Sequence, residues 1–122
     1  MAYKVLIVDD DQELSELLKC YLEGAGFQVK TASGGEEALE CYGEFDPHVI
    51  LLDLVMPVMD GFEVCRILRQ ERGSKATIVV LSANEIVEDM GRAFNLGVDD
   101  YIIKSFEVDG RTIVEKISRH LP

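Results

Sequence analysis

Residues 49–53 read Val49-Ile50-Leu51-Leu52-Asp53, four apolar residues in succession that end in a carboxylate. A run of this length, led by β-branched residues, favours a buried strand over a helix. Continuous apolar runs are typical of parallel sheets, because helices cover both faces of such sheets. A carboxylate directly after buried residues is costly as a purely structural choice. The stretch therefore predicts a buried strand that delivers Asp53 to a functional site.

Similar apolar runs recur along the chain. Three of them occupy residues 5–8, 78–81 and 101–103. Between residues 27 and 31, a phenylalanine, a valine and a threonine alternate with polar residues, as expected of a half-exposed edge strand. Together with residues 49–52, these segments predict five strands.

Segments with helical periodicity separate the strands. The first has one apolar stripe, formed by Leu14, Leu17, Leu18, Tyr21 and Leu22. The last has another, formed by Ile113, Val114, Ile117 and Leu121. The fourth helix is expected to begin near Glu85 and to stop at Gly97, since glycine commonly ends helices.

Capping signals mark the second and third helices. Ser33 with Glu36, and Asp60 with Glu63, have the spacing of a capping box. Five strands and five helices then follow one another in strict alternation. That order predicts a doubly wound α/β fold with a parallel sheet, as one domain over residues 1–122.

Composition excludes several classes of function. The net charge of −11 argues against direct nucleic-acid binding, which needs clustered basic residues. The apolar runs are far shorter than the roughly 20 residues of a membrane span, and the N-terminus lacks a signal peptide pattern. A cytoplasmic protein is expected. Three cysteines without C-x-x-C spacing are interpreted as reduced, buried or half-buried thiols: Cys20, Cys41 and Cys65.

Polar side chains follow the predicted strands at their carboxyl ends, where open α/β sheets bind ligands. They are Asp9, Asp10 and Asp11 after the first strand, Asp53 after the third, Ser82 after the fourth and Lys104 after the fifth. Clustered carboxylates repel one another unless a cation bridges them, and Mg²⁺ prefers such oxygen ligands. An aspartate beside that metal can attack phosphorus, while Lys104 and Ser82 meet the phosphoryl oxygens. Asp11 is interpreted as a cap of the first helix.

The chain resembles the receiver domains of two-component response regulators, with a chemotaxis-regulator-like organisation. The resemblance is carried over the whole chain by Asp9-Asp10, Asp53-Leu54-Val55-Met56-Pro57, Asp60-Gly61, Ser82-Ala83, and Tyr101 with Lys104. It implies a flavodoxin-like strand order of 2-1-3-4-5 and phosphorylation of Asp53. It also implies Mg²⁺ on Asp10, Asp53 and the Val55 carbonyl, with Asp9 supporting the metal's waters. Ser82 and Lys104 would bind the phosphoryl group.

The resemblance further implies a switch and its partners. Phosphorylation would draw Ser82 toward the phosphoryl group and turn Tyr101 inward, which changes the surface of the fourth helix, fifth strand and fifth helix. The phosphoryl donor would be a sensor histidine kinase or a phosphotransfer protein. An output domain or a separate downstream protein would read the switch. The same surface offers a mixture of charges suited to a symmetric homodimer: Arg92, Asp99, Asp100, Arg111, Glu115 and Lys116.

Three departures from the family pattern matter. Lys104 precedes Ser105, where the family usually has a cis proline, and a cis bond before a non-proline residue costs about 2.5–4 kcal/mol. Ser82 replaces the commoner threonine and keeps the hydroxyl. The side chain of Val55 cannot orient an attacking water, which predicts slow loss of the phosphoryl group. Met56 and Met59 are interpreted as packing residues of their loop.

Three alternatives remain at this point. Asp9-Asp10-Asp11 has the D-x-D pattern of haloacid-dehalogenase-like phosphatases, although Gln12 follows and no cap domain is present in the sequence. A flavodoxin-like cofactor binder would share the architecture, but the first loop lacks a phosphate cradle. A degenerate receiver would use the fold for protein contacts alone.

Overall fold

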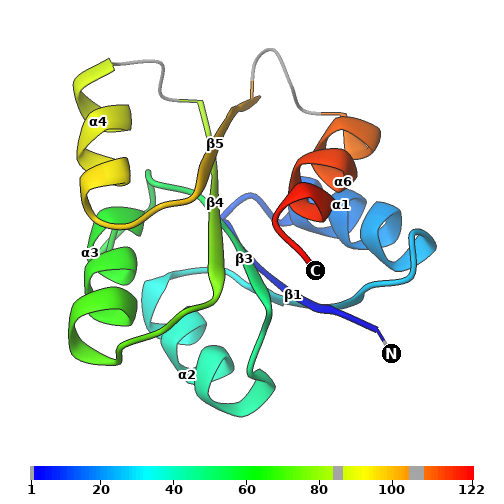
Figure 1. The fold of residues 1–122 in the computed structure, drawn as a ribbon, viewed down its shortest axis with the longest axis horizontal. Coiled ribbons are helices and arrows are strands. Elements are labelled where there is room, and N and C mark those ends of the chain that lie inside the picture. Colours follow the sequence, from blue (N-terminus) through cyan, green and yellow to red (C-terminus); the bar gives the residue numbers. More distant parts are fainter. Residues whose placement is uncertain (1, 84–86, 105–108) are drawn as a thin grey trace.

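The computed structural model describes residues 2–83, 87–104 and 109–122. Within them, strands and helices alternate along the chain (Figure 1). The strands are β1 (Lys4–Val8), β2 (Gln28–Ala32), β3 (Val49–Leu52), β4 (Thr77–Ser82) and β5 (Asp100–Ile103). The helices are α1 (Gln12–Gly24), α2 (Gly35–Phe45), α3 (Gly61–Arg66), α4 (Val87–Asn95) and α6 (Gly110–Arg119).

The five strands form one parallel sheet in the order β2-β1-β3-β4-β5. This confirms the predicted doubly wound α/β fold and its strand order. β2 lies at an edge, as its alternating pattern indicated: Val29 is buried, whereas Gln28 and Lys30 are exposed. β3 lies at the centre, and all four of its residues are buried.

Helices cover both faces of the sheet (Figure 1). On one face, α2, α3 and α4 pack over alternate residues of the strands, with a core that includes Leu6, Val8, Ala38, Ile50, Leu52, Phe62, Val64, Leu68 and Ala93. On the other face, α1 and α6 pack over the intervening residues, with a core that includes Val5, Ile7, Leu18, Leu22, Val49, Leu51, Ile113 and Ile117. No helix in the described ranges is both long and apolar enough to cross a membrane.

Two of the predicted helix starts and one stop are confirmed. Asp11 caps α1 by accepting a hydrogen bond from the Leu14 N–H at 3.1 Å. Asp60 caps α3 by accepting one from the Glu63 N–H at 2.9 Å. Gly97 follows α4 with a φ of 99°, a left-handed conformation that suits glycine. The expected start of the fourth helix near Glu85 lies outside the described residues.

The predicted capping box of the second helix is wrong. The capping position is Gly34, not Ser33, and α2 begins at Gly35 without a side-chain cap. Gly35 packs so closely on Met59 that a Cβ there would lie 2.7 Å from the methionine side chain. The Ser33 hydroxyl donates to the Glu37 carboxylate at 3.2 Å instead of capping the helix.

The apolar stripe of α1 is wider than the part of the helix that is buried against the rest of the protein. Leu18 and Leu22 are buried as predicted, but the side chains of Leu17 and Tyr21 remain 57% and 50% exposed. Cys20, which lies between them in sequence, is exposed, so its prediction as a buried thiol is wrong. The stripe shows which side of the helix faces inward, whereas burial also requires a neighbouring element over each residue.

Cys41 is half-buried and Cys65 is buried, as predicted. Burial raises the pKa of both thiols, so the reactive thiolate is disfavoured at each position.

The third helix continues from α3 into a π-helical segment, η1 (Ile67–Glu71), which the sequence did not predict. Arg69 in this segment donates hydrogen bonds to the carbonyl groups of Gly97, Ser74 and Ala76 at 2.7–3.0 Å. It also pairs with Asp99 at 2.9 Å. One guanidinium thus ties the third helix to the segments on both sides of β4.

Candidate functional site

The parallel register of β1 and β3 places two carboxylates side by side. Val8 pairs with Leu52, so the next residue of each strand, Asp9 and Asp53, leaves the sheet at the same edge. The Asp53 N–H donates to the Val8 carbonyl at 2.9 Å and extends the ladder by one bond. Asp9 and Asp53 are only 3% and 4% exposed. The sheet therefore fixes both acids at its carboxyl end in a largely dry position.

Asp10 completes a cluster of three acids. Carboxylate oxygens of Asp9, Asp10 and Asp53 lie within 4.8 Å of one another, and Asp10 is the exposed member. Adjacent strands are separated by about 4.7–4.9 Å, so the ends of β1 and β3 hold Asp9 and Asp53 close together. The cluster is thus open to solvent at Asp10 and buried at Asp9 and Asp53.

Lys104, directly after β5, bridges the two buried acids. Its ammonium lies 2.8 Å from Asp9 Oδ2 and 3.4 Å from Asp53 Oδ2. The remaining oxygens accept backbone hydrogen bonds: Asp9 Oδ1 from the Asp11 N–H at 2.9 Å, and Asp53 Oδ1 from the Val55 N–H at 3.2 Å. Each buried carboxylate is therefore held through both of its oxygens. Ser105, whose bond to Lys104 was singled out in the sequence, lies outside the described residues.

The electrostatics of the cluster favour an added positive charge. Burial and the neighbouring charge of Asp9 raise the pKa of Asp53 to about 6, although Lys104 and the Val55 N–H act in the opposite direction. Burial would lower the pKa of Lys104, but its bonds to Asp9 and Asp53 outweigh burial and raise it. One ammonium faces three carboxylates, so a negative excess remains at the opening.

Ser82 and Tyr101 lie in the interior beside this edge. Ser82 ends β4 and is fully buried, and Tyr101 in β5 is 6% exposed. Burial raises the pKa of the Tyr101 phenol, while a side-chain hydrogen bond with Ser82 opposes that rise. The two residues predicted to form a switch are therefore joined, with the tyrosine in an inward position.

The loop between β3 and α3 depends on a glycine whose role the sequence did not reveal. A Cβ on Gly61 would lie 2.2 Å from the carbonyl oxygen of Asp53, and its N–H donates to the Leu54 carbonyl at 2.9 Å. The loop thus folds back onto the backbone of Asp53. The Asp60-Gly61 pair is the sequence signal for this turn, since glycine permits close backbone approach. Met56 is buried in the core and Met59 packs on it, which confirms their interpretation as packing residues.

The cluster has the donor set of a magnesium site. Mg²⁺ binds carboxylate and carbonyl oxygens and retains several waters, and the exposed Asp10 side leaves room for them. The fixed, partly dry carboxylate of Asp53 and the adjacent ammonium of Lys104 also suit phosphoryl chemistry, which depends on positioning and charge neutralisation.

Comparison with known proteins identifies this arrangement. A family model described as "Response regulator receiver domain" matches residues 5–118. The chain belongs to the response regulator receiver family. Receiver domains are the phospho-accepting signalling domains of two-component systems, and this receiver shares their acidic pocket. The family assignment removes the support for a haloacid-dehalogenase-like phosphatase or a flavodoxin-like binder.

The receiver is similar in sequence to a part of longer regulators from several organisms. The DNA-binding response regulator MtrA of Mycolicibacterium paratuberculosis is 40% identical over 107 residues, which are 88% of this chain and 47% of that protein. The probable transcriptional regulator ycf27 of Guillardia theta is 42% identical over 103 residues, which are 84% of this chain and 40% of that protein. The chain spans about half the length of the curated relatives it matches.

Solved structures have the same fold. The chemotaxis protein CheY4 of Vibrio cholerae matches with a TM-score of 0.90 and 30% identity, over 99% of this chain and 100% of that chain. The response regulator DrrB of Thermotoga maritima, described as an OmpR/PhoB homolog, matches with a TM-score of 0.86 and 30% identity. That match covers 99% of this chain and 53% of DrrB.

Proposed function

We propose that Asp53 is the phosphoryl acceptor of this receiver, with residues 1–122 acting as one unit. The observation that supports this most directly is the position of its buried carboxylate, which contacts the Lys104 ammonium and clusters with the carboxylates of Asp9 and Asp10. Asp9, Asp10, Asp53 and the backbone carbonyl of Val55 would hold Mg²⁺. The bound ion would neutralise charge on the phosphoryl oxygens.

In the proposed reaction, a carboxylate oxygen of Asp53 attacks the phosphorus of a phosphohistidine on a sensor histidine kinase or a phosphotransfer protein. The P–N bond breaks, and the imidazole leaves with its electron pair and takes up a proton from solvent. The product is an acyl phosphate on Asp53. Lys104 then exchanges its contact with the Asp53 carboxylate for one with a phosphoryl oxygen. The role is regulatory, because the receiver promotes only its own phosphorylation and dephosphorylation.

The switch would run through Ser82 and Tyr101. A phosphoryl group on Asp53 would compete for the Ser82 hydroxyl, which now bonds with Tyr101. That competition would bias the surface of α4, β5 and α6, a two-state element read by an output domain, a downstream protein or a second receiver. The net charge of −11 supports the view that an attached domain or partner, and not the receiver, contacts DNA. We place the protein in the cytoplasm.

Intact-mass measurement tests the acceptor. Incubation with acetyl phosphate and Mg²⁺ should add one phosphoryl group, about 80 Da, that hydroxylamine removes. The adduct should be lost in Asp53→Ala and in EDTA. Absence of an adduct with several donors, together with absence of Mg²⁺ binding, would instead indicate a degenerate receiver.

A matched pair of lysine variants tests the bridging ammonium. Lys104→Met should slow phosphorylation by acetyl phosphate about tenfold or more, because an interaction made with the phosphoryl group in the transition state is lost. Lys75→Met, at an exposed position outside the cluster, should phosphorylate like wild type. Equal rates for the two variants would exclude Lys104 from the reaction.

The lifetime of the phosphoryl group tests the role of residue 55. The side chain of Val55 is largely exposed beside Asp53 and has no hydrogen-bonding group for a water. Val55→Asn should therefore shorten the decay of the phosphorylated protein relative to wild type. Equal lifetimes would show that this side chain does not control hydrolysis.

A further inference from the structure

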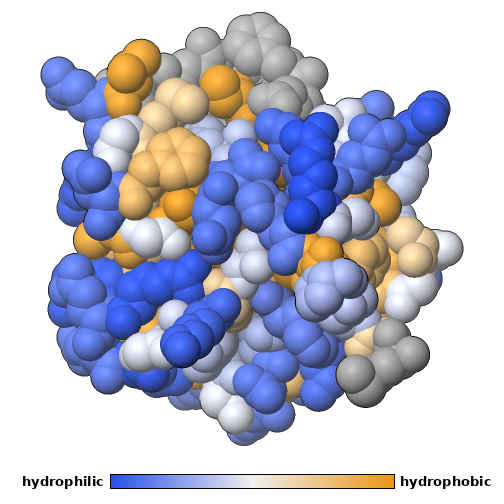
Figure 2. Space-filling model, viewed as in Figure 1, coloured by the Kyte–Doolittle hydropathy of each residue, from blue (hydrophilic) through white to orange (hydrophobic). Residues whose placement is uncertain are grey.

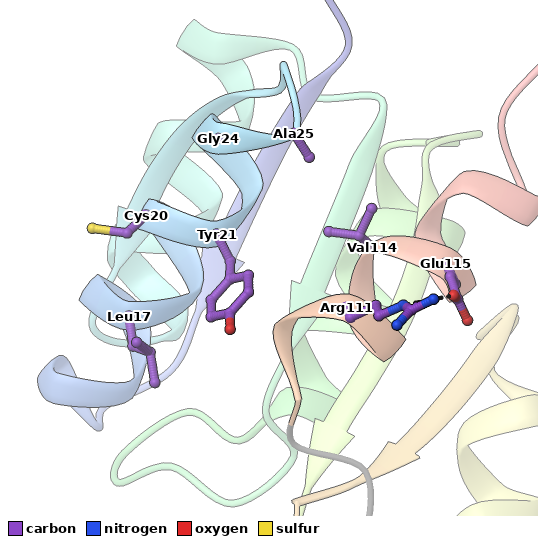
Figure 3. A pocket seen from close by; sticks show the side chains of 8 residues that line it. All are labelled: Leu17, Cys20, Tyr21, Gly24, Ala25, Arg111, Val114 and Glu115. Carbon is purple, nitrogen blue, oxygen red and sulfur yellow. Dashed lines mark ion pairs between the residues drawn. The ribbon is translucent and has the colours of Figure 1, made fainter.

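Two hollows in the surface contrast in their chemistry. The larger, the α1–α6 groove, has a volume of about 570 Å³, and Tyr21 on α1 and Val114 on α6 face each other across it (Figure 3). Figure 2 shows apolar surface on this side of the molecule, with hydrophilic surface around it. The charged residues that line the groove, Arg111 and Glu115, pair with each other at 3.6 Å. The groove therefore leaves no charge for a ligand to neutralise.

The second hollow, the β2 pocket, lies at the carboxyl end of β2 and has a volume of about 300 Å³. The parallel register places Ala32 beside Val8, and the Asp9 N–H donates to the Ala32 carbonyl at 3.1 Å. Asp9 therefore lies next to the residues that end β2, and it lines the pocket together with Thr31 and Ser33. Open α/β sheets bind ligands at the carboxyl ends of their strands, so the pocket is well placed for a ligand.

The lining of the β2 pocket is acidic. On α1, Gln12, Ser15 and Glu16 line it, and their spacing of three and four residues places them on one side of the helix. Glu37 of α2 and the buried Asp9 add two more carboxylates. Among the described residues that line the pocket, none is basic. Unlike the groove, the pocket thus has negative charge that a ligand can neutralise.

Ser15 provides an independent sign of a ligand. The residue is 4% exposed, and its Oγ has no hydrogen-bond partner within the part of the chain that the structure describes. Buried hydroxyl groups are nearly always hydrogen-bonded, because a buried group without a partner is costly. Since Ser15 lines the β2 pocket, a ligand with hydrogen-bond donors would supply the partner that the protein lacks.

The carboxylates retain capacity to accept hydrogen bonds. Asp9 accepts from the Asp11 N–H at 2.9 Å and from the Lys104 ammonium at 2.8 Å, whereas a carboxylate offers about four acceptor sites. Glu37 accepts from the Ser33 hydroxyl at 3.2 Å through one of its two oxygens. The pocket therefore suits a cation that carries several hydrogen-bond donors.

The spacing of the acceptors favours an extended cation over a metal ion. The carboxylate oxygens of Asp9, Glu16 and Glu37 do not all lie within 4.8 Å of one another, so they cannot close around one ion as those of the acidic cluster can. A guanidinium is planar and directs its N–H donors outward to several sides, so it reaches acceptors that lie apart. A volume of about 300 Å³ also exceeds that of a single ion and holds a guanidinium with part of an attached chain.

We propose that the β2 pocket binds a small molecule that carries a guanidinium group. The N–H groups of the ligand donate to the carboxylates of the lining and to the Ser15 Oγ. The planar ion lies between the first turn of α1 and the end of β2, with its charge close to Asp9. The remainder of the ligand extends toward solvent past the exposed Glu16 and Glu37.

Two-dimensional NMR of the isotope-labelled, unphosphorylated protein without Mg²⁺ measures the binding. Methylguanidinium, added to about 50 mM at constant ionic strength, should move the amide resonances of Ser15, Thr31 and Ser33 to saturation, with a Kd below about 10 mM. Tetramethylammonium has the same charge but no N–H donor, and it should bind at least tenfold more weakly. Equal behaviour of the two cations, or shifts that do not saturate, would overturn the proposal, because diffuse attraction to a chain with a net charge of −11 gives that result.

A matched pair of glutamate variants locates the site. Glu16→Gln should weaken the binding of methylguanidinium at least threefold, because a carboxylate of the lining is lost. Glu13→Gln makes the same change on the same helix, at an exposed residue that does not line the pocket, and should leave the Kd unchanged. Both variants alter the net charge of the protein equally. Equal effects on the Kd would therefore assign the binding to overall charge and overturn the proposal.

Ser15→Ala separates a binding role from a structural one. The variant should bind methylguanidinium at least threefold more weakly. Because the hydroxyl has no partner to lose, its melting temperature should equal or exceed that of wild type. A lower melting temperature with unchanged binding would show that the hydroxyl serves the fold, which would count against the proposal.

An occupied β2 pocket should also act on the acidic cluster, because Asp9 belongs to both. A guanidinium beside Asp9 repels Mg²⁺, and each cation weakens the binding of the other by the same factor. This coupling rests on the proposed function, whereas binding is measured without the metal, so the two can fail separately. At subsaturating Mg²⁺, methylguanidinium should slow phosphorylation by acetyl phosphate at least twofold, and tetramethylammonium should not. An unchanged rate in protein that binds methylguanidinium would overturn the coupling through Asp9.

Discussion

The acidic cluster and the α1–α6 groove are built in opposite ways. In the cluster, backbone atoms fix the geometry: the strand register places Asp9 and Asp53, and the β3–α3 loop folds onto the Asp53 carbonyl. In the groove, side chains on two helices fix the geometry, and the bordering ones are half-exposed. Backbone-built sites have few ways to relax, whereas side chains at a surface can rotate away. The cluster should therefore respond sharply to small changes that the groove tolerates.

The largest expected effect is that of one methyl group in the cluster. Gly61→Ala should destabilise the protein by about 2–3 kcal/mol, because the new Cβ meets backbone that cannot move without displacing Asp53. Phosphorylation by acetyl phosphate should slow by about tenfold or more, since a small displacement of the reacting group is costly. Denaturant unfolding and intact-mass kinetics measure the two effects.

Gly91→Ala is the control for this substitution. Nothing lies within 4 Å of a Cβ at Gly91 in α4, so alanine should stabilise the helix by about 0.5–1 kcal/mol. Similar behaviour of the two variants would show that the backbone of the β3–α3 loop adapts more readily than its contacts indicate.

The same methyl group beside the groove should have a smaller effect. Gly110→Ala meets the Tyr21 ring, which is half-exposed and can turn into solvent, so a loss of about 1 kcal/mol is expected. Phosphorylation by acetyl phosphate should stay at the wild-type rate, and the ring resonances of Tyr21 should move in NMR spectra. A loss of phosphorylation would contradict the separation of the two regions.

A substitution that relieves backbone strain in the cluster's loop should stabilise the protein. Val58 has a φ of 70° and a fully exposed side chain, and a left-handed conformation costs a non-glycine residue about 1–2 kcal/mol. Val58→Gly removes that cost but adds freedom to the unfolded chain, so a net gain of about 0.5–1 kcal/mol is expected. Thermal unfolding should show a higher melting temperature. An unchanged or lower one would mean that the valine has a compensating contact.

The smallest expected effect concerns the polar anchor of α6. Burial raises the pKa of Asp100, but hydrogen bonds from His120 and the Tyr101 N–H outweigh it, so the pKa lies below its ordinary value. A lowered folded-state pKa contributes stability above the unfolded value and loses it as pH falls through the folded value. Asp100→Asn should thus cost a few tenths of a kcal/mol at pH 6, and the difference from wild type should vanish near pH 2–3. A constant difference over that range would assign the effect to packing.

The sequence predicted the cluster better than the groove, for a physical reason. Asp9 and Asp53 each follow an apolar run, and strands in one parallel sheet end at one edge, so their meeting needs no knowledge of side-chain packing. Lys104 could be placed at that edge by the same reasoning, and it bridges both acids.

The surroundings of α1 could not be predicted in this way. The stripe with Leu17 and Tyr21 indicated burial, but burial depends on how far α6 lies from α1, which no local pattern encodes. Arg69 was missed for a related reason. Its partners Ser74, Ala76, Gly97 and Asp99 are brought together only by the tertiary fold.

The exposed edge of β2 has a consequence for aggregation. An edge strand offers unpaired backbone groups on which a second chain can add a strand, and this is how sheets extend into fibrils. Lys30 lies near the middle of β2, exposed, and its ammonium is held 5.8 Å from the centre of the Phe45 ring. A strand that approached this edge would have to displace or desolvate that charge. Lys30 thereby protects the sheet against edge-to-edge growth.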